Sequence, residues 1–258
     1  MLSGWQSNRC RSITRQPARQ TAFLFAKVAT YFPQLMSLKA YNRNMSIQEM
    51  RKTYSMSGLS KSEIDLDPVI QFQHWFEQAQ QPDLPDWVEV NAMTLSTADL
   101  KGNVTSRIVL LKGIEDGRLC FYTNYHSQKG RQIQDNPQVS LCFLWAHLQR
   151  QVRIEGTVTK SERSKSADYF RTRPRESQLG AHVSQQSSIV DSSQTLQNRF
   201  VELQTEYEQA EIPCPEHWGG YEVQPNRYEF WQGRPGRLHD RICYQLVEDQ
   251  WQISRLAP

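Results

Sequence analysis

The chain of 258 residues lacks the side-chain spacings that hold metal ions. Its five cysteines are widely separated and include no Cys-x-x-Cys pair, and its six histidines show no paired ligand spacing, so we expect no metal site. Scattered cysteines of this kind are typical of reduced thiols in an intracellular protein. No apolar run approaches the roughly 20 residues that cross a bilayer, so we expect a soluble protein with no membrane partner.

The chain also lacks the motifs of several common chemistries. It has no Gly-x-Gly-x-x-Gly or Walker sequence, no reactive-cysteine motif and no Ser-His-Asp order, which argues against a glycine-loop nucleotide site and against hydrolysis. The net charge is only +3, with no clustered basic helix, so nucleic acid is not an expected partner. The hydrophobic share of 38% and the charged share of 22% are those of an ordinary globular protein.

Acidic residues are absent from the first 48 positions, which carry seven lysines and arginines. Such a segment is typical of an organellar presequence, here residues 1–44, or of a disordered or untranslated leader with the working start at Met45. Composition does not separate these alternatives. We therefore treat residues 1–48 as an N-terminal extension and expect a cytoplasmic protein, with an organelle as the alternative location.

Hydrophobic periodicity and turn residues predict mainly β structure. Short strands with hairpin-type turns are expected at residues 91–97, 107–112, 118–123, 139–145 and 151–158, followed by a terminal hairpin of 218–231 and 237–246. Helices are expected from Pro68, capped by Asp67 and ended by Pro82, and over 127–136, 161–172 and 193–209. This order favours an antiparallel sheet closed into a small barrel with flanking helices, rather than a Rossmann fold.

Positive side chains stand at the ends of several predicted elements. Arg107 and Lys112 would face opposite sides of a regular strand, so a shared ligand would need a bulge or would wrap the strand end. Lys129 lies at a helix N-terminus, which can bind phosphate, although helix capping by Ser127 is the commoner interpretation. Arg173 lies in a loop that either meets an anion or is simply solvated. Together these cations fit the binding of two phosphorylated planar molecules better than hydrolysis.

The spacing of Arg237, His239 and Arg241 gathers positive charge in a short run. Side chains two residues apart share one face of an extended strand, and like charges there repel unless an anion lies against them. We therefore expect this run to be extended and to face an anionic ligand.

Many ordered segments between about residue 50 and residue 258 resemble the pyridoxine/pyridoxamine 5'-phosphate oxidase family. They include Arg107-Ile-Val-Leu-Leu-Lys112, Phe121-Tyr-Thr-Asn124, Arg150-Gln-Val-Arg153, Gln186-Ser-Ser188, Trp218-Gly-Gly220, Glu229-Phe-Trp-Gln-Gly233 and Arg237-Leu-His-Asp-Arg241. The resemblance implies a mainly β, antiparallel Greek-key split barrel over residues 49–258, a single domain in which residues 216–258 form a hairpin for dimerisation and the active site. It also implies a homodimer that binds FMN in clefts between its subunits.

The resemblance further implies an oxidation of pyridoxine 5'-phosphate and pyridoxamine 5'-phosphate to pyridoxal 5'-phosphate. Oxygen would accept the electrons and become hydrogen peroxide, and the amine substrate would also release ammonia. The implied FMN contacts are Arg107, Ile108, Val109, Leu110, Leu111, Lys112, Tyr122, Thr123, Gln128, Lys129, Gln151, Gln186, Ser187, Trp231 and Arg241. The implied substrate contacts are Arg51, Tyr54, Lys112, Tyr169, Arg173, Ser177, Arg237, Leu238 and His239.

Within this set, the resemblance makes Arg237 and His239 the pair that shapes the reaction. An arginine stays protonated at ordinary pH, so Arg237 is expected to orient the substrate, whereas His239 could move a proton. Arg51 and Tyr54 match a segment that folds over the site as a lid, or else form an ordinary frayed terminus. Gln128 stands where the family has Arg or Lys, which leaves one cation fewer near the FMN phosphate.

Three other functions remain as alternatives. A non-catalytic split-barrel protein could carry flavin or pyridoxal phosphate, and a related flavin oxidase could act on another ring, such as a phenazine precursor. The phosphate-binding matches argue against an unphosphorylated substrate. A nucleic-acid-binding module would rest only on scattered basic residues.

Overall fold

The computed structural model describes residues 46–258 apart from Arg51 and Ser57. The chain divides into two units, Met1–Lys52 and Thr53–Pro258, and the described part of the first unit contains one short 3-10 helix, η2 (Ile47–Glu49). The expected presequence or leader and the expected lid residue Arg51 lie outside the described residues. All the elements that follow belong to the second unit.

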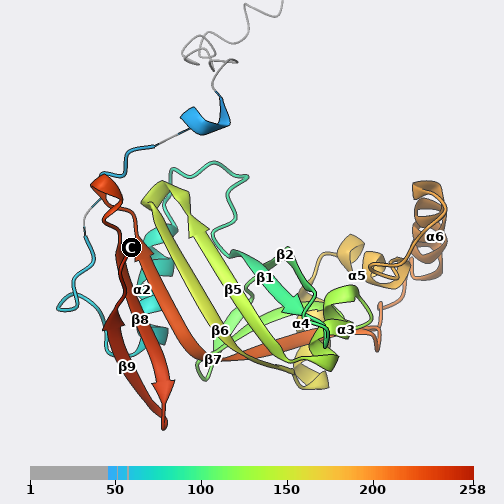
Figure 1. The fold of residues 1–258 in the computed structure, drawn as a ribbon. Coiled ribbons are helices and arrows are strands. Elements are labelled where there is room, and N and C mark those ends of the chain that lie inside the picture. The colour runs from blue at the N-terminus through green and yellow to red at the C-terminus, as the bar shows by residue number, and fades with distance from the viewer. Residues whose placement is uncertain (1–45, 51, 57) are drawn as a thin grey trace, which may run out of the picture. The chain divides into compact units, whose positions relative to one another are not determined.

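An antiparallel sheet of nine strands forms the body of this unit in the part of the chain that the structure describes (Figure 1). The strands are β1 (Ala92–Ala98), β2 (Val104–Leu110), β3 (Gly113–Glu115), β4 (Arg118–Asn124), β5 (Gln138–Trp145), β6 (Arg150–Lys160), β7 (Trp218–Gln232), β8 (Asp240–Val247) and β9 (Gln250–Arg255). Neighbours follow the order β2-β1-β5-β6-β7-β4-β3, and β8 pairs with β7 and β9. The curled antiparallel sheet confirms the predicted split barrel.

Strand β7 joins two parts of the sheet. Its first half pairs with β4 and its second half pairs with β8, while β6 runs beside it along most of its length. The pairing of β6 with β7 shifts between Glu155 and Gly156, and a bulge of this kind bends a strand and increases its twist. The two halves of β7 therefore serve different regions of the protein.

Helix α2 (Pro68–Ala79) packs on the inner side of the sheet. Its N-cap is Asp67, whose Oδ1 accepts a hydrogen bond from the Val69 backbone N–H at 2.8 Å, as the capping pattern predicts. Helical spacing buries Phe72 and Trp75, whose rings contact aromatic rings of β5 and β7. These contacts anchor the helix to the middle of the sheet.

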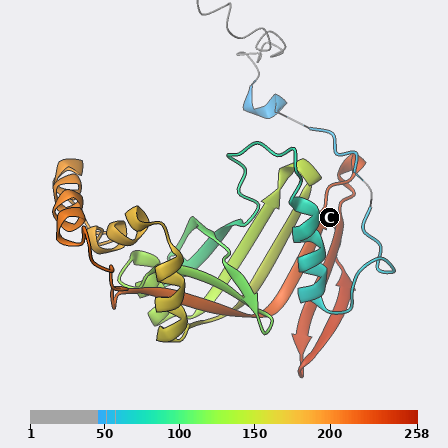
Figure 2. The same cartoon turned by 180° about the vertical axis from the view of Figure 1, so that it is seen from behind.

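Four further α-helices follow α2 in the described chain: α3 (Gln128–Asp135), α4 (Arg163–Thr172), α5 (Arg175–Val183) and α6 (Ser193–Glu206). Helix α3 packs against β1, α4 against β7, and α5 against α6. Figures 1 and 2 show α4, α5 and α6 at one end of β7 and the hairpin of β8 and β9 at the other. No helix of the described residues is long and apolar enough to cross a membrane.

The hydrophobic core consists of two clusters, one inside the sheet and one among the helices at the start of β7. A large cluster fills the inside of the sheet beneath α2. A smaller cluster consists of Phe170, Leu179, Leu203, Ile212 and Trp218 and joins the helices α4, α5 and α6 to the start of β7.

Two predicted strands differ from the structure at their ends, and some observed elements, among them β3 and α5, were not predicted. The second strand is Val104–Leu110 rather than 107–112. Helix α5 has no predicted counterpart, because Pro174 suggests a helix breaker but here occupies the N-cap of α5, where a proline does no harm. The predicted strand 237–246 is wrong at its start, because Arg237 ends the 3-10 turn η4 (Pro235–Arg237) with a φ of 62°.

Close packing at Gly130 in α3 provides a test of the fold. A Cβ added there would collide with the backbone carbonyl of Tyr125, so we expect Gly130→Ala to lower the free energy of unfolding by about 2 kcal/mol in urea denaturation. Gly180→Ala in α5 is the control, since its Cβ would meet nothing within 4 Å, and it should raise stability by up to about 1 kcal/mol. Equal midpoints for the two variants would contradict this packing.

Candidate functional site

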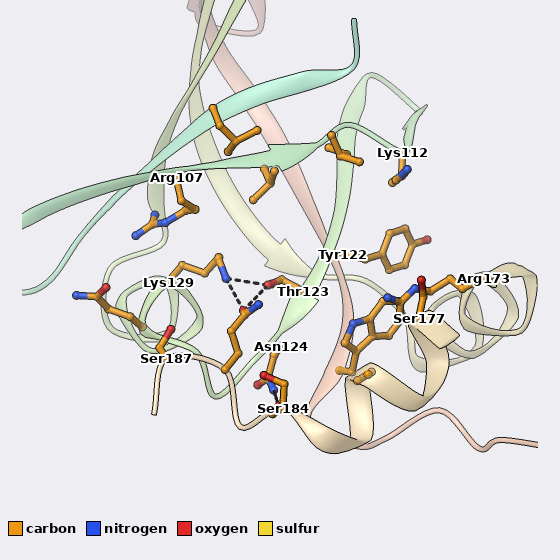
Figure 3. Close-up of a pocket in the computed structure, with 18 of the residues that line it drawn as sticks. Arg107, Lys112, Tyr122, Thr123, Asn124, Lys129, Arg173, Ser177, Ser184 and Ser187 are labelled. Carbon is orange, nitrogen blue, oxygen red and sulfur yellow. Dashed lines mark hydrogen bonds between the residues drawn. The ribbon is translucent and has the colours of Figure 1, made fainter. Parts of the chain in front are cut away.

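A pocket lies where β2 and β4 meet α3, α4 and α5. Its cavity measures about 800 Å³, which is within the range of small-molecule sites. Figure 3 shows Arg107 and Lys129 toward one side of the pocket and Lys112 and Arg173 toward the other. The pocket therefore has two basic ends.

Lys129, in the first turn of α3, is the most buried cation of the first end, at 8% exposure. Its Nζ donates hydrogen bonds to Thr123 Oγ1 at 3.0 Å, Ser127 Oγ at 3.2 Å and Gln186 Oε1 at 2.6 Å. Burial, and after it the charge of Arg107, lowers the pKa of Lys129 to about 8. A buried ammonium group that has only neutral partners favours an anionic ligand.

The guanidinium of Arg107 is fixed at the same end. It donates to the Leu95 carbonyl oxygen at 3.1 Å, to Thr97 Oγ1 at 2.7 Å and to Thr105 Oγ1 at 2.5 Å. Both threonine hydroxyls donate in turn to Gln132 Oε1, at 2.6 and 2.7 Å, so each hydroxyl presents lone pairs to Arg107. Gln132 thus fixes the direction of these bonds. The sequence does not reveal this role, because its partners come from two other elements.

Arg173 lies at the second basic end, between α4 and α5. Its Nη1 atom is buried without a hydrogen-bond partner among the described residues, which costs free energy unless a ligand accepts from it. Helix α5 begins two residues later and has no side-chain cap, so its first backbone N–H groups favour an anion. Ser177, in that first turn, also lines the pocket. This end therefore suits a phosphate or a carboxylate.

Aromatic rings line the pocket beside Arg173. Tyr122 and Tyr169 stack with their centroids 3.9 Å apart and 19° between their planes, and Trp218 lies nearly parallel to Tyr122 at 5.5 Å. Burial raises the pKa of Tyr122 to about 12, so its phenol stays neutral. A flat neutral wall beside a cation suits an aromatic ligand that carries an anionic group.

Lys112 reaches this pocket because β2 ends at Leu110. The chain turns after the strand, so Arg107 and Lys112 both line one cavity. No bulge within the strand is needed to bring these two cations to one cavity.

Three further expected FMN contacts lie in a row on the sheet. Gln151 on β6 is the register partner of Trp231 on β7, which is in turn the partner of Arg241 on β8. Glu229 Oε1 accepts from Arg241 Nε at 2.9 Å, and Glu229 is only 3% exposed. The expected extended run that places Arg237, His239 and Arg241 on one strand face is therefore wrong at its start. Arg237 lies in a turn outside the strand, and the anion beside Arg241 is a carboxylate of this chain.

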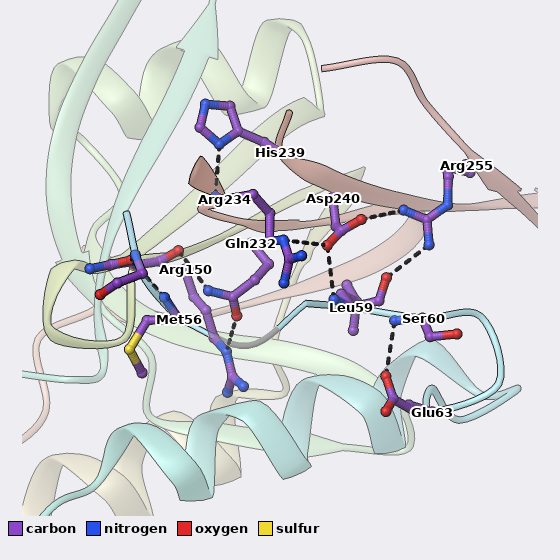
Figure 4. Close-up of polar contacts among 12 residues, drawn as sticks. Met56, Leu59, Ser60, Glu63, Arg150, Gln232, Arg234, His239, Asp240 and Arg255 are labelled. Atoms are coloured by element: carbon purple, nitrogen blue, oxygen red, sulfur yellow. Dashed lines mark hydrogen bonds and ion pairs between the residues drawn. The ribbon is translucent and has the colours of Figure 1, made fainter. Parts of the chain in front are cut away.

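His239 lies in an aromatic cluster beside this row. Its ring centroid is 4.7 Å from that of Trp231 and 5.4 Å from that of Tyr54. The Arg234 backbone N–H donates to His239 Nδ1 at 3.1 Å (Figure 4). A backbone N–H can only donate, so the proton of the neutral imidazole is on Nε2.

The segment before α2 is tied to the C-terminal hairpin. The Leu59 N–H donates to Asp240 Oδ2 at 3.0 Å, and Arg255 donates to both Asp240 and the Leu59 carbonyl oxygen (Figure 4). Tyr54 packs over Gly233, where an added Cβ would come within 2.7 Å of its ring. The described part of the expected lid thus lies against the hairpin.

The structure brings most of the expected site residues into the pocket. Those that line it are Arg107, Ile108, Val109, Leu110, Lys112, Tyr122, Thr123, Gln128, Lys129, Tyr169, Arg173, Ser177, Gln186 and Ser187. The described ones that do not are Tyr54, Leu111, Gln151, Trp231, Arg237, Leu238, His239 and Arg241. Leu111 is in the core, and Arg237 and Leu238 are exposed. Trp218 lines the pocket without having been expected there, although it begins one of the matching segments.

Comparisons with known proteins find similar sequences along most of the chain. Residues 81–207 match the family model described as pyridoxamine 5'-phosphate oxidase, and residues 218–258 match the pyridoxine 5'-phosphate oxidase C-terminal dimerisation region. A Rhodopirellula baltica protein named pyridoxine/pyridoxamine 5'-phosphate oxidase is 54% identical over 217 residues, which cover 83% of this chain and 97% of that protein. A Nostoc sp. protein of the same name is 50% identical over 214 residues, covering 83% and 99%.

Two solved structures share the fold. PhzG from Burkholderia lata 383, in complex with tetrahydrophenazine-1-carboxylic acid, has a TM-score of 0.73 at 25% identity and covers 79% of this chain and 100% of its own. A pyridoxamine 5'-phosphate oxidase-related, FMN binding protein from Nostoc punctiforme has a TM-score of 0.59 at 17% identity, covering 76% and 100%. The curled sheet and its basic pocket thus define a split-barrel oxidase of the flavoprotein type. With relatives at 54% and 50% identity over most of its length, the chain belongs to the pyridoxamine 5'-phosphate oxidase family.

The lowered pKa of Lys129 predicts a pH-dependent affinity for phosphorylated ligands. Below about pH 8 the ammonium is charged before a ligand arrives, whereas above it the lysine must also take up a proton, so affinity falls as pH rises. We expect FMN, titrated by fluorescence, to bind up to about tenfold more weakly at pH 9 than at pH 7.

Two variants of Lys129 separate this effect from others. Lys129→Arg keeps its positive charge from pH 7 to pH 9, so its affinity for FMN should not change with pH. Lys129→Met has no charge at this position and should bind FMN weakly at every pH. A wild-type affinity that is constant from pH 7 to pH 9 would show that Lys129 does not titrate there.

Proposed function

We propose that this chain, as a homodimer with FMN, oxidises pyridoxine 5'-phosphate and pyridoxamine 5'-phosphate to pyridoxal 5'-phosphate. The names of its relatives support this substrate class. The observation that carries the proposal is the buried, unpaired Nη1 of Arg173 at one end of a pocket whose other end holds the buried Lys129. Two anion sites in one cavity suit two phosphorylated molecules, a cofactor and a substrate.

The Lys129 end fits the phosphate of FMN. Lys129 and Arg107 supply positive charge, Ser187 supplies a hydroxyl, and the N-terminus of α3 adds its dipole. Gln128 is an uncharged donor, so the two cations carry the electrostatic attraction. Gln186 Oε1 now accepts from Lys129, and a bound phosphate would take over that hydrogen bond. When bound, FMN supplies the acceptor for a hydride from C4' of the substrate and passes the electrons to O2, which becomes H2O2.

The Arg173 end fits the phosphate of the substrate. Arg173 offers its unpaired N–H, and Ser177, Tyr169 and Lys112 line the same end of the pocket. Held there, the alcohol substrate loses a hydride and a proton from its C4' group to become the aldehyde. The amine substrate would lose a hydride from C4' and a proton from its nitrogen, and water would then hydrolyse the resulting imine to the aldehyde and ammonia.

A partner subunit would complete each pocket. Trp218 lines the pocket, whereas Trp231, in the row of Gln151 and Arg241, lies near the other end of β7 and lines no part of it. One chain therefore does not place this row in its own pocket, whereas two-fold symmetry would present the row of each subunit to the pocket of the other. We assign residues 49–258 to one oxidase domain and its hairpin 216–258 to dimerisation, in accord with the family model for 218–258.

Arg237 and His239 would then act on the substrate ring from across the dimer. Arg237 is exposed and permanently charged, so it would orient the substrate and close the site. His239 has its Nδ1 occupied by the Arg234 N–H, so its neutral ring would donate a hydrogen bond from Nε2.

Oxygen uptake by the FMN-loaded protein tests the proposed reaction. We expect pyridoxamine 5'-phosphate and pyridoxine 5'-phosphate each to consume oxygen and to yield peroxide and the aldehyde absorbance. Binding of the ligands without peroxide or aldehyde would instead indicate a flavin or pyridoxal phosphate carrier. Oxidation of tetrahydrophenazine-1-carboxylic acid, the ligand in the PhzG structure, but of neither vitamin phosphate would indicate a flavin oxidase that acts on another ring.

Two arginines of the C-terminal hairpin are expected to have different effects. Arg237→Ala should lower turnover or substrate affinity by at least about tenfold while the protein stays yellow and dimeric, since we assign Arg237 to the substrate rather than to FMN. Arg241→Ala should weaken FMN binding first, as measured by flavin titration. Loss of FMN from Arg237→Ala would contradict this division of roles.

A further inference from the structure

The indole of Trp218 is held firmly at the start of β7. Trp218 is 6% exposed, its backbone N–H donates to the Pro215 carbonyl at 3.0 Å, and its own carbonyl accepts from Arg163 Nη1 at 2.8 Å. The ring of Phe170 meets the indole edge to face, with centroids 5.1 Å apart. The indole is therefore a fixed surface within the pocket.

The guanidinium of Arg173 lies against this surface. Its Cζ is 4.6 Å from the centroid of Trp218 and 5.5 Å from that of Phe170, distances at which a cation is attracted to an aromatic ring. Arg173 makes no side-chain hydrogen bond or ion pair among the residues that the structure describes, and its Nη1 is buried and unpaired. Aromatic rings, rather than a carboxylate, therefore hold this cation.

The kind of partner decides what the cation can still do. Arg241 is held by Glu229 at 2.9 Å, which uses its Nε and Nη2 donors and balances its charge. A ring face attracts the guanidinium through its quadrupole and uses none of its in-plane N–H groups. Arg173 is thus held in place while its charge and its donors remain available for a ligand.

Trp218 also sets the orientation of the neighbouring tyrosines. Its ring plane is 7° from that of Tyr169 and 12° from that of Tyr122. Gly220 makes room for this stack, because a Cβ there would come within 2.9 Å of Tyr122. The same indole therefore contacts both the cation and the aromatic wall of the second basic end.

We propose that Trp218 is a positioning residue for the substrate phosphate, which holds the Arg173 guanidinium by its ring face so that the N–H groups of Arg173 remain free for that phosphate. This inference rests on the proposed function for the identity of the substrate. The anion that it concerns is a phosphate group, and inorganic phosphate, which is no substrate, tests it even if the protein oxidises neither vitamin phosphate.

The test compares ligands with and without a phosphate on FMN-loaded Trp218→Leu and Trp218→Phe. We expect Trp218→Leu to bind pyridoxal 5'-phosphate and inorganic phosphate about 2- to 30-fold more weakly than the wild type, the range of a cation–π contact. Its affinity for pyridoxal, which has no phosphate, should stay within about twofold of the wild-type affinity. Trp218→Phe keeps a ring face and should lose less. Equal weakening of pyridoxal and pyridoxal 5'-phosphate would overturn the inference, because it would indicate general damage to the pocket.

A double-mutant cycle separates positioning from packing. When Arg173 is already replaced by Ala, adding Trp218→Leu should lower the affinity for pyridoxal 5'-phosphate no further, because the cation that Trp218 positions is absent. If Trp218→Leu lowers the affinity for pyridoxal 5'-phosphate by the same factor with and without Arg173, the inference is overturned. Where Trp218→Leu fails to fold, Trp218→Met, which also lacks a ring face, replaces it in the cycle.

Trp75 provides a matched control. It is 3% exposed and carries Arg150 at 4.3 Å over its ring, but Arg150 already donates to Gln232 and Gln78 and lines no part of this pocket. Trp75→Phe should lower stability while leaving phosphate affinity unchanged. A loss of phosphate affinity equal to that of Trp218→Phe would show that the effect is one of core packing alone.

Discussion

Positive charge that is buried or partly buried without a carboxylate partner is the constraint on which this protein depends. Lys129 is held by two hydroxyls and an amide oxygen, Arg107 by a carbonyl and two threonines, and Arg173 by aromatic rings. None of the three forms an ion pair within the described residues. Burial of a charge among neutral groups is costly, and a bound anion removes that cost. The pocket therefore favours anionic ligands before any contact with their rings is considered.

The acidic side chains that could cancel this charge lie elsewhere. Glu229 is almost fully buried on the sheet and is approached by Arg153, Arg227 and Arg241. Strand β7 keeps the two regions apart, because one half of it pairs with β4 beside the pocket and the other half with β8. A single long strand thus separates a cationic pocket from a neutralised row, and a homodimer is the arrangement that would bring them together.

Local patterns predicted most of the fold. The N-cap at Asp67, the capped start of α3 at Ser127 and the alternation of the central strands are short-range signals, and the corresponding elements are present within a few residues. Helix α5 and the turn η4 were not predictable in this way, because a proline stands at the start of each and its effect depends on its position relative to the helix. Motif resemblance identified the residues of the Lys129 and Arg173 ends, but no motif indicated that Gln132 and Trp218 hold the arginines in place.

The sequence by itself determined the family, the antiparallel class of fold and the residue types of the two basic ends, since these depend on periodicity, turn residues and ordered motifs. Only the tertiary structure decided which cations share a cavity and what each one is paired with. Arg237, His239 and Arg241 are neighbours in sequence, yet Arg241 is neutralised by Glu229 on the adjacent strand, while His239 packs on Trp231 and Arg237 is exposed. Arg107 and Arg173 are far apart in sequence, yet they line one pocket. The physical reason is that charge pairing and burial are set by contacts between distant segments, which a local pattern does not contain.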